Sequence, residues 1–242
     1  MMNRFVRLLL AIVLLMNFNS YSYAAKGAAS VYKITITKVE LCETGSTISN
    51  CLNPDDITVG GGVADVDIAA VTAGEAAGVV ADFSRLTPGK TYTYLQAILK
   101  REMKISGVAD GCYTENDGVY NANGGRAVGS TSSSDQAEVS LFVPYFSQND
   151  SFLMIEGSSD ASGTSLAEAG EIRSTDTHFR SRQVLSSSYT HKVGISPTVF
   201  LAFDTSLGVE DDQIYTGSPG TCGSNETLGA APPTQTITIQ GQ

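Results

Sequence analysis

Apolar and polar residues alternate along much of this chain, and a period of two is typical of a β-strand rather than a helix. Residues 33–38 read KITITK, and residues 236–240, near the other end, read TITIQ. Between them, short apolar runs are separated by clusters of Gly, Ser, Asn and Pro, which form turns. The sequence therefore predicts an all-β fold: an antiparallel β-sandwich of jelly-roll or immunoglobulin-like type, with long polar loops and little helix.

One strand is expected to be irregular. In residues 31–41 the apolar positions change from even (Tyr32, Ile34) to odd (Val39, Leu41). A regular strand would send these two sets to opposite faces. We therefore expect a bulge or twist near Thr37.

Other segments predict turns, strands and loops. Pro88–Gly89 fits the two central positions of a type II turn. Residues 92–99, which follow, are apolar on both faces and predict a central strand. Residues 107–137 are rich in Gly, Asn, Ser and Asp and predict long surface loops, while residues 178–193 could not be assigned. Residues 234–240 predict the final strand.

Residues 1–24 have the features of a secretory signal peptide. Arg4 and Arg7 precede an apolar run at residues 8–16, and residues 22–24 read SYA. That run is shorter than the roughly 20 apolar residues that span a bilayer, and no later segment comes close. The alternative is an uncleaved membrane anchor. We expect residues 25–242 to form a single domain without a membrane span, located in the periplasm, at the cell surface or outside the cell.

Four cysteines follow the predicted cleavage site: Cys42, Cys51, Cys112 and Cys222. In an exported protein an even number indicates disulfides, and four cysteines allow three pairings. The residues between Cys42 and Cys51 include Gly, Ser and Asn, as a loop would, so we predict bridges Cys42–Cys51 and Cys112–Cys222. The alternative, a metal site with four thiolates, lacks the paired CxxC spacing.

The chain is acidic, with 25 Asp and Glu against 15 Lys and Arg. Loss of the leader removes two arginines and no acid, so the net charge changes from −10 to −12. Such a surface repels nucleic acid. Two acidic segments carry oxygen ligands of the kind calcium prefers. The candidate calcium ligands are Glu115, Asp117, Glu210, Asp211 and Asp212. Neither segment matches the DxDxDG loop, so ordinary solvated turns are the alternative, and we expect no other cofactor.

Few residues could perform catalysis. His178 and His191 are the two histidines, and they form neither an HxH nor an HExxH pattern. We expect both on the surface. No GxSxG motif is present. The sequence therefore predicts that the protein is not an enzyme, with no catalytic residues, and a secreted hydrolase is the weakest alternative.

The two similar terminal strands suggest a function. An exported β domain can complete the sheet of a neighbour with a terminal strand, as in chaperone–pilin complexes. Residues 25–30, AKGAAS, are small enough to act as the hinge. We therefore predict a secreted structural subunit of a cell-surface or extracellular filament, a homopolymer.

Two alternatives to this function remain open. The terminal strands could be ordinary edge strands of a sandwich. The protein would then be a monomeric binding module for a glycan or a protein. Tyr113 and Tyr120 would be the natural contact residues of such a module.

Overall fold

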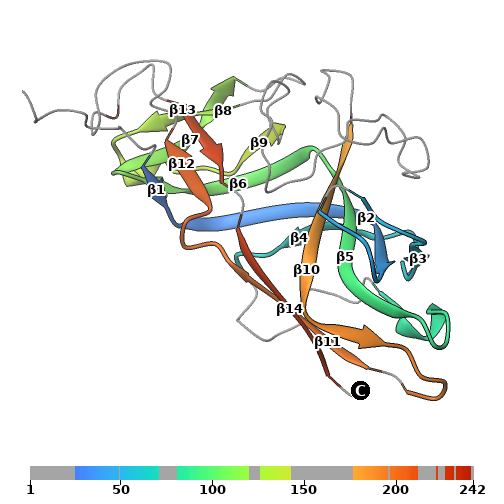
Figure 1. Ribbon diagram of the computed structural model, residues 1–242. Coiled ribbons are helices and arrows are strands. Elements are labelled where there is room, and N and C mark those ends of the chain that lie inside the picture. The colour runs from blue at the N-terminus through green and yellow to red at the C-terminus, as the bar shows by residue number, and fades with distance from the viewer. Residues whose placement is uncertain are drawn as a thin grey trace, which may run out of the picture.

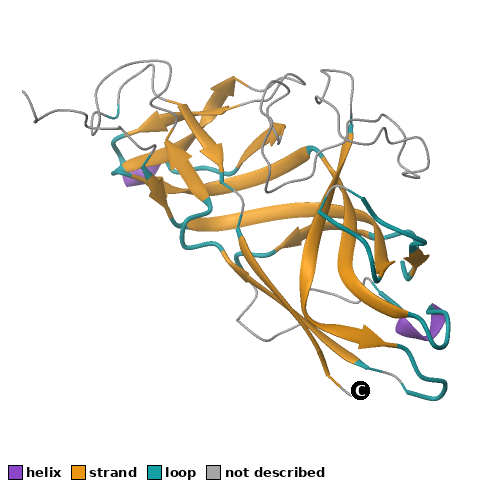
Figure 2. Cartoon of the chain, viewed as in Figure 1, coloured by secondary structure: helices purple, strands orange, loops and turns teal. Residues whose placement is uncertain are grey.

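The computed structural model of this chain describes residues 25–48, 50–70, 81–119, 126–142, 177–195, 197–211, 222, 227–231 and 233–240. Apart from the 3-10 helices η1 (Phe83–Arg85) and η2 (Ser133–Asp135), every regular element in these residues is a strand (Figure 2). The strands are β1 (Lys26–Gly27), β2 (Ala29–Glu43), β3 (Asp55–Asp56), β4 (Val63–Asp67), β5 (Thr91–Lys100), β6 (Glu102–Ala109), β7 (Cys112–Val119), β8 (Arg126–Ser130), β9 (Val139–Phe142), β10 (His178–Thr190), β11 (Thr198–Asp204), β12 (Val209–Asp211), β13 (Thr227–Ala230) and β14 (Thr234–Gln240). The predicted all-β class is confirmed. The predicted leader lies outside the described residues, and within them no helix is long and apolar enough for a membrane crossing.

Twelve strands form one antiparallel sheet that curls into a half-barrel (Figure 1). Nine of them run in the order β1-β12-β13-β8-β7-β6-β2-β5-β10, while β3 and β4 pair with β2, and β9 pairs with β6. The remaining two, β11 and β14, form a separate two-stranded sheet, here called the C-terminal ribbon. The predicted sandwich is not confirmed, because one large curled sheet with a ribbon beside it takes the place of two stacked sheets.

Strand β2, which contains KITITK, is central to the large sheet. It is 15 residues long and pairs with β3, β4, β5 and β6. The predicted bulge is confirmed, since the register with β5 shifts between Ile36 and Lys38. This shift lets Ile36 and Val39 both be buried. Residues 25–30 do not form the predicted hinge, because β1 pairs with β12 and Ala29 begins β2.

The strand pairing closes on itself at one end of the molecule (Figure 1). From β6 it runs through β7, β8, β13 and β12 to β1. Ala28, next to β1, then accepts a hydrogen bond from the backbone N–H of Val108 on β6 (3.1 Å). We call these strands the closed ring. A Cβ on Gly107 would collide with the carbonyl oxygen of Ala28 and lie 2.6 Å from Cγ2 of Val209. A glycine is therefore needed at this close approach between strands of the ring.

The prediction of long surface loops over residues 107–137 is wrong. This region contains the end of β6 and all of β7 and β8, which belong to the closed ring. Thr114 shows how polar residues are accommodated there. It is fully buried, and its hydroxyl accepts a hydrogen bond from Gly107 N (3.1 Å) and donates one to Ala137 O (2.8 Å). The Gly, Asn, Ser and Asp content of these residues indicated loops, because composition alone does not show which polar groups pair with distant parts of the chain.

Both predicted disulfides are confirmed. Cys42–Cys51 closes the loop after β2, and Cys112–Cys222 joins residues 110 positions apart. The long bridge lies against Gly129 of β8, where a Cβ would be 3.2 Å from Sγ of Cys222. Two disulfides fit a protein that folds in an oxidising compartment outside the cytoplasm.

The predicted turn before β5 is also confirmed. Gly89 has φ of 82°, and Lys90 N donates to Thr87 O (3.3 Å). The strand that follows, β5, lies between β2 and β10, as expected of a strand that is apolar on both faces.

A partly buried carboxylate joins β3 to this turn. Asp55 accepts hydrogen bonds from the hydroxyl of Tyr92, from Lys90 Nζ (2.9 Å) and from Thr87 N (2.8 Å). Burial alone would raise the pKa of Asp55, but these hydrogen bonds outweigh it and hold the pKa well below its usual range. The ionised form is therefore the one that stabilises the fold.

We expect Asp55→Asn to lower the free energy of unfolding by about 2 kcal/mol at pH 7, the effect of losing hydrogen bonds to a charged group. Because the folded-state pKa lies below the unfolded value of about 3.9, the carboxylate stabilises the protein fully above that pH. Its contribution is lost as the pH falls from there through the folded-state pKa. Urea unfolding should therefore show the difference between wild type and variant shrinking below about pH 4. A difference that stays constant from pH 7 to pH 3 would contradict this explanation.

Candidate functional site

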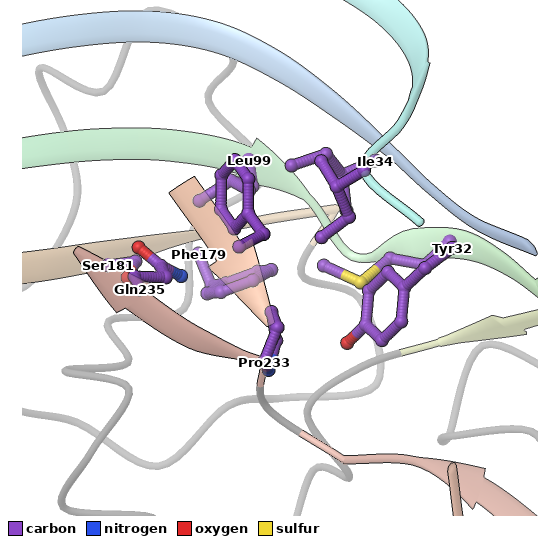
Figure 3. A pocket seen from close by; sticks show the side chains of 10 residues that line it. Tyr32, Ile34, Leu99, Phe179, Ser181, Pro233 and Gln235 are labelled. Atoms are coloured by element: carbon purple, nitrogen blue, oxygen red, sulfur yellow. The ribbon is translucent and has the colours of Figure 1, made fainter. Parts of the chain in front are cut away.

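An apolar pocket lies between the large sheet and the C-terminal ribbon (Figure 3). Strand β2 contributes Tyr32 and Ile34, β5 contributes Leu99, and β10 contributes Phe179. Alternation along β2 places Tyr32 and Ile34 on the same inward face. The wall that the sheet provides is therefore formed by large aliphatic and aromatic side chains.

The C-terminal ribbon closes the pocket from the other side. The lining residues on this side are Phe203 of β11, Pro233 just before β14, and Gln235 of β14. The cavity volume is about 30 Å³, and the pocket is partly open to solvent. The pocket is therefore completed by residues at the extreme C-terminal end of the described chain.

Two hydroxyl groups reach the pocket. Tyr32 donates its hydroxyl to Ala231 O (3.1 Å), and burial, together with the carboxylate of Glu210, raises the pKa of Tyr32, so it remains a neutral donor. Ser181 is 5% exposed, and its Oγ has no hydrogen-bond partner within the described part of the chain. Leaving a buried hydroxyl unpaired costs free energy. The pocket therefore has an apolar lining and one unpaired hydrogen-bonding group.

A row of buried polar side chains crosses the other face of the sheet. Glu40 contacts Lys38 Nζ (2.6 Å) and accepts from Gln96 Nε2 (2.6 Å). Arg182 donates Nε–H to Gln96 Oε1 and Nη1–H to Ile48 O (3.0 Å). The row links β2, β5, β10 and the loop closed by the short disulfide. Because its members bond to one another, it serves as a structural link between these elements rather than as an open site.

The predicted calcium ligands lie on two different strands. Glu115 lies on β7, and Glu210 and Asp211 lie on β12, with β8 and β13 between them in the sheet. Asp117 belongs to β7, but its side chain and that of Asp211 are not described, and Asp212 lies outside the described residues. Among the described side chains, no three His, Cys, Asp or Glu residues come together. A calcium site stays an untested prediction.

Both histidines are buried, contrary to the prediction of surface positions. Nδ1 of His178 lies 2.8 Å from Oγ1 of Thr177, and Nδ1 of His191 lies 3.1 Å from the hydroxyl of Tyr189. They lie at opposite ends of β10, which at its ordinary rise separates them by roughly 40 Å. The two imidazoles therefore do not form a common site.

No family model, curated protein or solved structure matches this chain. Two features of the structure are candidates for a functional role: the pocket and the C-terminal ribbon that covers it. In the ribbon, residues 198–204 pair in register with residues 240–234. Ile237 and Ile239 are buried and Thr236 is exposed, so β14 has the predicted alternation of TITIQ.

Proposed function

We propose that this protein is a structural subunit, exported from the cytoplasm, that assembles with further copies of itself at the cell surface or outside the cell. The observation that carries the proposal is the C-terminal ribbon. Within the described residues, β14 has no strand partner except β11, although it buries two isoleucines on the core. A terminal strand that is strongly apolar on one face but weakly tied into the fold is what intermolecular strand pairing requires.

The other terminal strand is a poor candidate for this role. Strand β2 pairs with four neighbouring strands, and Cys42 within it is bridged to Cys51. Its removal would break the centre of the large sheet. Assembly through a terminal strand is therefore assigned to β14 and not to β2.

Electron microscopy of purified residues 25–242 tests the proposal. We expect filaments or other regular assemblies that become more abundant with protein concentration. The matched control is a chain that ends at Ala231 and so lacks β14, and it should form none. Single monomeric particles at every concentration would contradict the proposed function.

A second function, that of a binding module, is favoured by the unpaired hydroxyl of Ser181 in the pocket. The residues predicted for such a module do not form this site. Tyr113 lies on β7, and Tyr120 lies outside the described residues. The ligand would instead be a small molecule with an apolar body and one hydrogen-bonding atom.

Phenol and benzene are a matched pair of probes for the pocket, since they differ by one hydroxyl. If the pocket binds such ligands, phenol should shift the NMR signals of β10 and β14. Ser181→Ala should then weaken phenol binding about fivefold, the equivalent of one hydrogen bond of about 1 kcal/mol, and leave benzene binding unchanged. No shift with phenol, or equal losses for both probes, would reject a binding role for Ser181.

A further inference from the structure

We propose that β14 is exchanged between copies: the β14 of one chain leaves its own β11 and pairs with the β11 of a second copy of this chain. This exchange rests on the self-assembly proposed above, and it identifies the contact through which copies join. It also assigns the pocket as the surface that receives the incoming strand.

No covalent link holds β14 in its place. The cysteines of both disulfides precede β14 in the chain, so both bridges remain intact when the strand moves. Its ladder with β11 comprises seven residue pairs and is the single ladder it makes in the described part of the chain. Separation of β14 therefore breaks one ladder, whereas separation of β2 would break four.

A fixed point and a stiff joint precede β14. Ala231 is fully buried, donates its N–H to Gly208 O (3.0 Å) and accepts a hydrogen bond from the hydroxyl of Tyr32 (3.1 Å). The sequence continues with Pro232–Pro233. Prolines lack an N–H and restrict the residue before them to extended conformations. The chain is thus anchored at Ala231, so movement of β14 leaves the hydrogen bonds of Ala231 and the pairing of β13 in place.

Loss of β14 from its position exposes apolar side chains to water, which is unfavourable. The β14 of a second copy can restore the same contacts. Departure of the strand uncovers the side of the pocket formed by Tyr32, Leu99 and Phe179. The incoming β14 restores the ladder with β11 and reburies two isoleucines, Ile237 and Ile239. The closed and exchanged forms therefore contain equivalent contacts, and protein concentration decides between them. Head-to-tail exchange yields an open filament unless the rotation between copies closes a ring.

Two variants of residues 25–242 that each add one cysteine, Ala202→Cys and Thr236→Cys, test the exchange. These positions are direct partners between β11 and β14, and Thr236 is exposed. A disulfide between them in two different chains requires β14 of one copy to lie beside β11 of the other. The variants are mixed in equal amounts at high concentration, oxidised mildly and analysed by mass spectrometry without reductant. In the control mixture Val193→Cys, at a loop position that is 80% exposed, replaces Ala202→Cys.

We expect linked chains at least tenfold more abundant in the test mixture than in the control mixture. Assemblies that form without the 202–236 link would overturn the exchange and leave the proposed self-assembly standing. Linked dimers without larger assemblies would support the exchange and contradict the filament. Monomers alone, without the link, would overturn both.

Discussion

Replacement of Gly107 by valine is expected to destabilise the folded protein strongly. The new Cβ would collide with the carbonyl oxygen of Ala28 and lie 2.6 Å from Cγ2 of Val209. The backbone oxygen cannot rotate away as a side chain can, so the closed ring must open or distort. Overpacking of this kind costs up to about 3 kcal/mol and occasionally more. A loss of that size is a large part of the roughly 5–15 kcal/mol that stabilises a typical domain.

Circular dichroism and urea unfolding measure this effect. The control is Lys104→Val on the same strand, where the side chain is 36% exposed and the change removes a surface ion pair with Asp65 (3.6 Å), which contributes little to stability. We expect the control to retain its unfolding transition and Gly107→Val to lose it or to shift it strongly to lower urea. Equal stability of the two variants would show that the ring does not close at Gly107.

Removal of the long disulfide is the second change with a large expected effect. Cys112 and Cys222 are 110 residues apart, and Cys42 and Cys51 are nine apart. In the chain-entropy model, a bridge that closes about 100 residues stabilises by about 4.7 kcal/mol, while the short bridge contributes about 3 kcal/mol. We expect the paired change Cys112→Ala and Cys222→Ala to lower the free energy of unfolding more than the paired change Cys42→Ala and Cys51→Ala.

Equilibrium unfolding in guanidinium chloride compares the two paired variants. Both retain one disulfide, so each serves as the control for the other. A larger loss from removing the short bridge would mean that local contacts of its loop, such as Arg182 with Ile48 O, outweigh the chain-entropy term.

Local signals in the sequence were sufficient to predict several features. The parity change after Ile36 predicted the bulge in β2, because the burial of both apolar sets leaves no other arrangement. The turn at Pro88–Gly89 follows from the φ preferences of the two residues. The even cysteine count and the loop-forming residues between Cys42 and Cys51 predicted both bridges. Each of these depends on residues that are close in sequence or of a strongly restricted type.

Features that depend on distant residues could not be predicted in this way. Closure of the ring brings Ala28 to Val108, and no local pattern indicates such a contact. The pocket likewise combines Tyr32, Phe179 and Pro233, which are far apart in the sequence. The same holds for the terminal strands: β2 is central and β14 lies outside the large sheet, although KITITK and TITIQ alternate alike.

Strand β10 was missed for a different reason. Its residues alternate, with Phe179 and Ser181 facing the pocket and Arg182 on the opposite face. Arg182 is 2% exposed, because it is part of the buried polar row that includes Gln96. A strand with charged residues on a buried face lacks the usual alternation of apolar and polar residues. The sequence of β10 therefore did not indicate a strand.

Sedimentation velocity of residues 25–242 distinguishes self-assembly through β14 from a protein that stays monomeric. The protein used for comparison is the double variant Ala202→Cys with Thr236→Cys. It is purified as an oxidised monomer, so that a disulfide locks β14 to its own β11. We expect the unmodified chain to form species of increasing mass as concentration rises and the locked chain to stay monomeric. Reduction of the added disulfide should restore assembly of the locked chain. Equal sedimentation of the unmodified and locked chains at all concentrations would contradict self-assembly through β14.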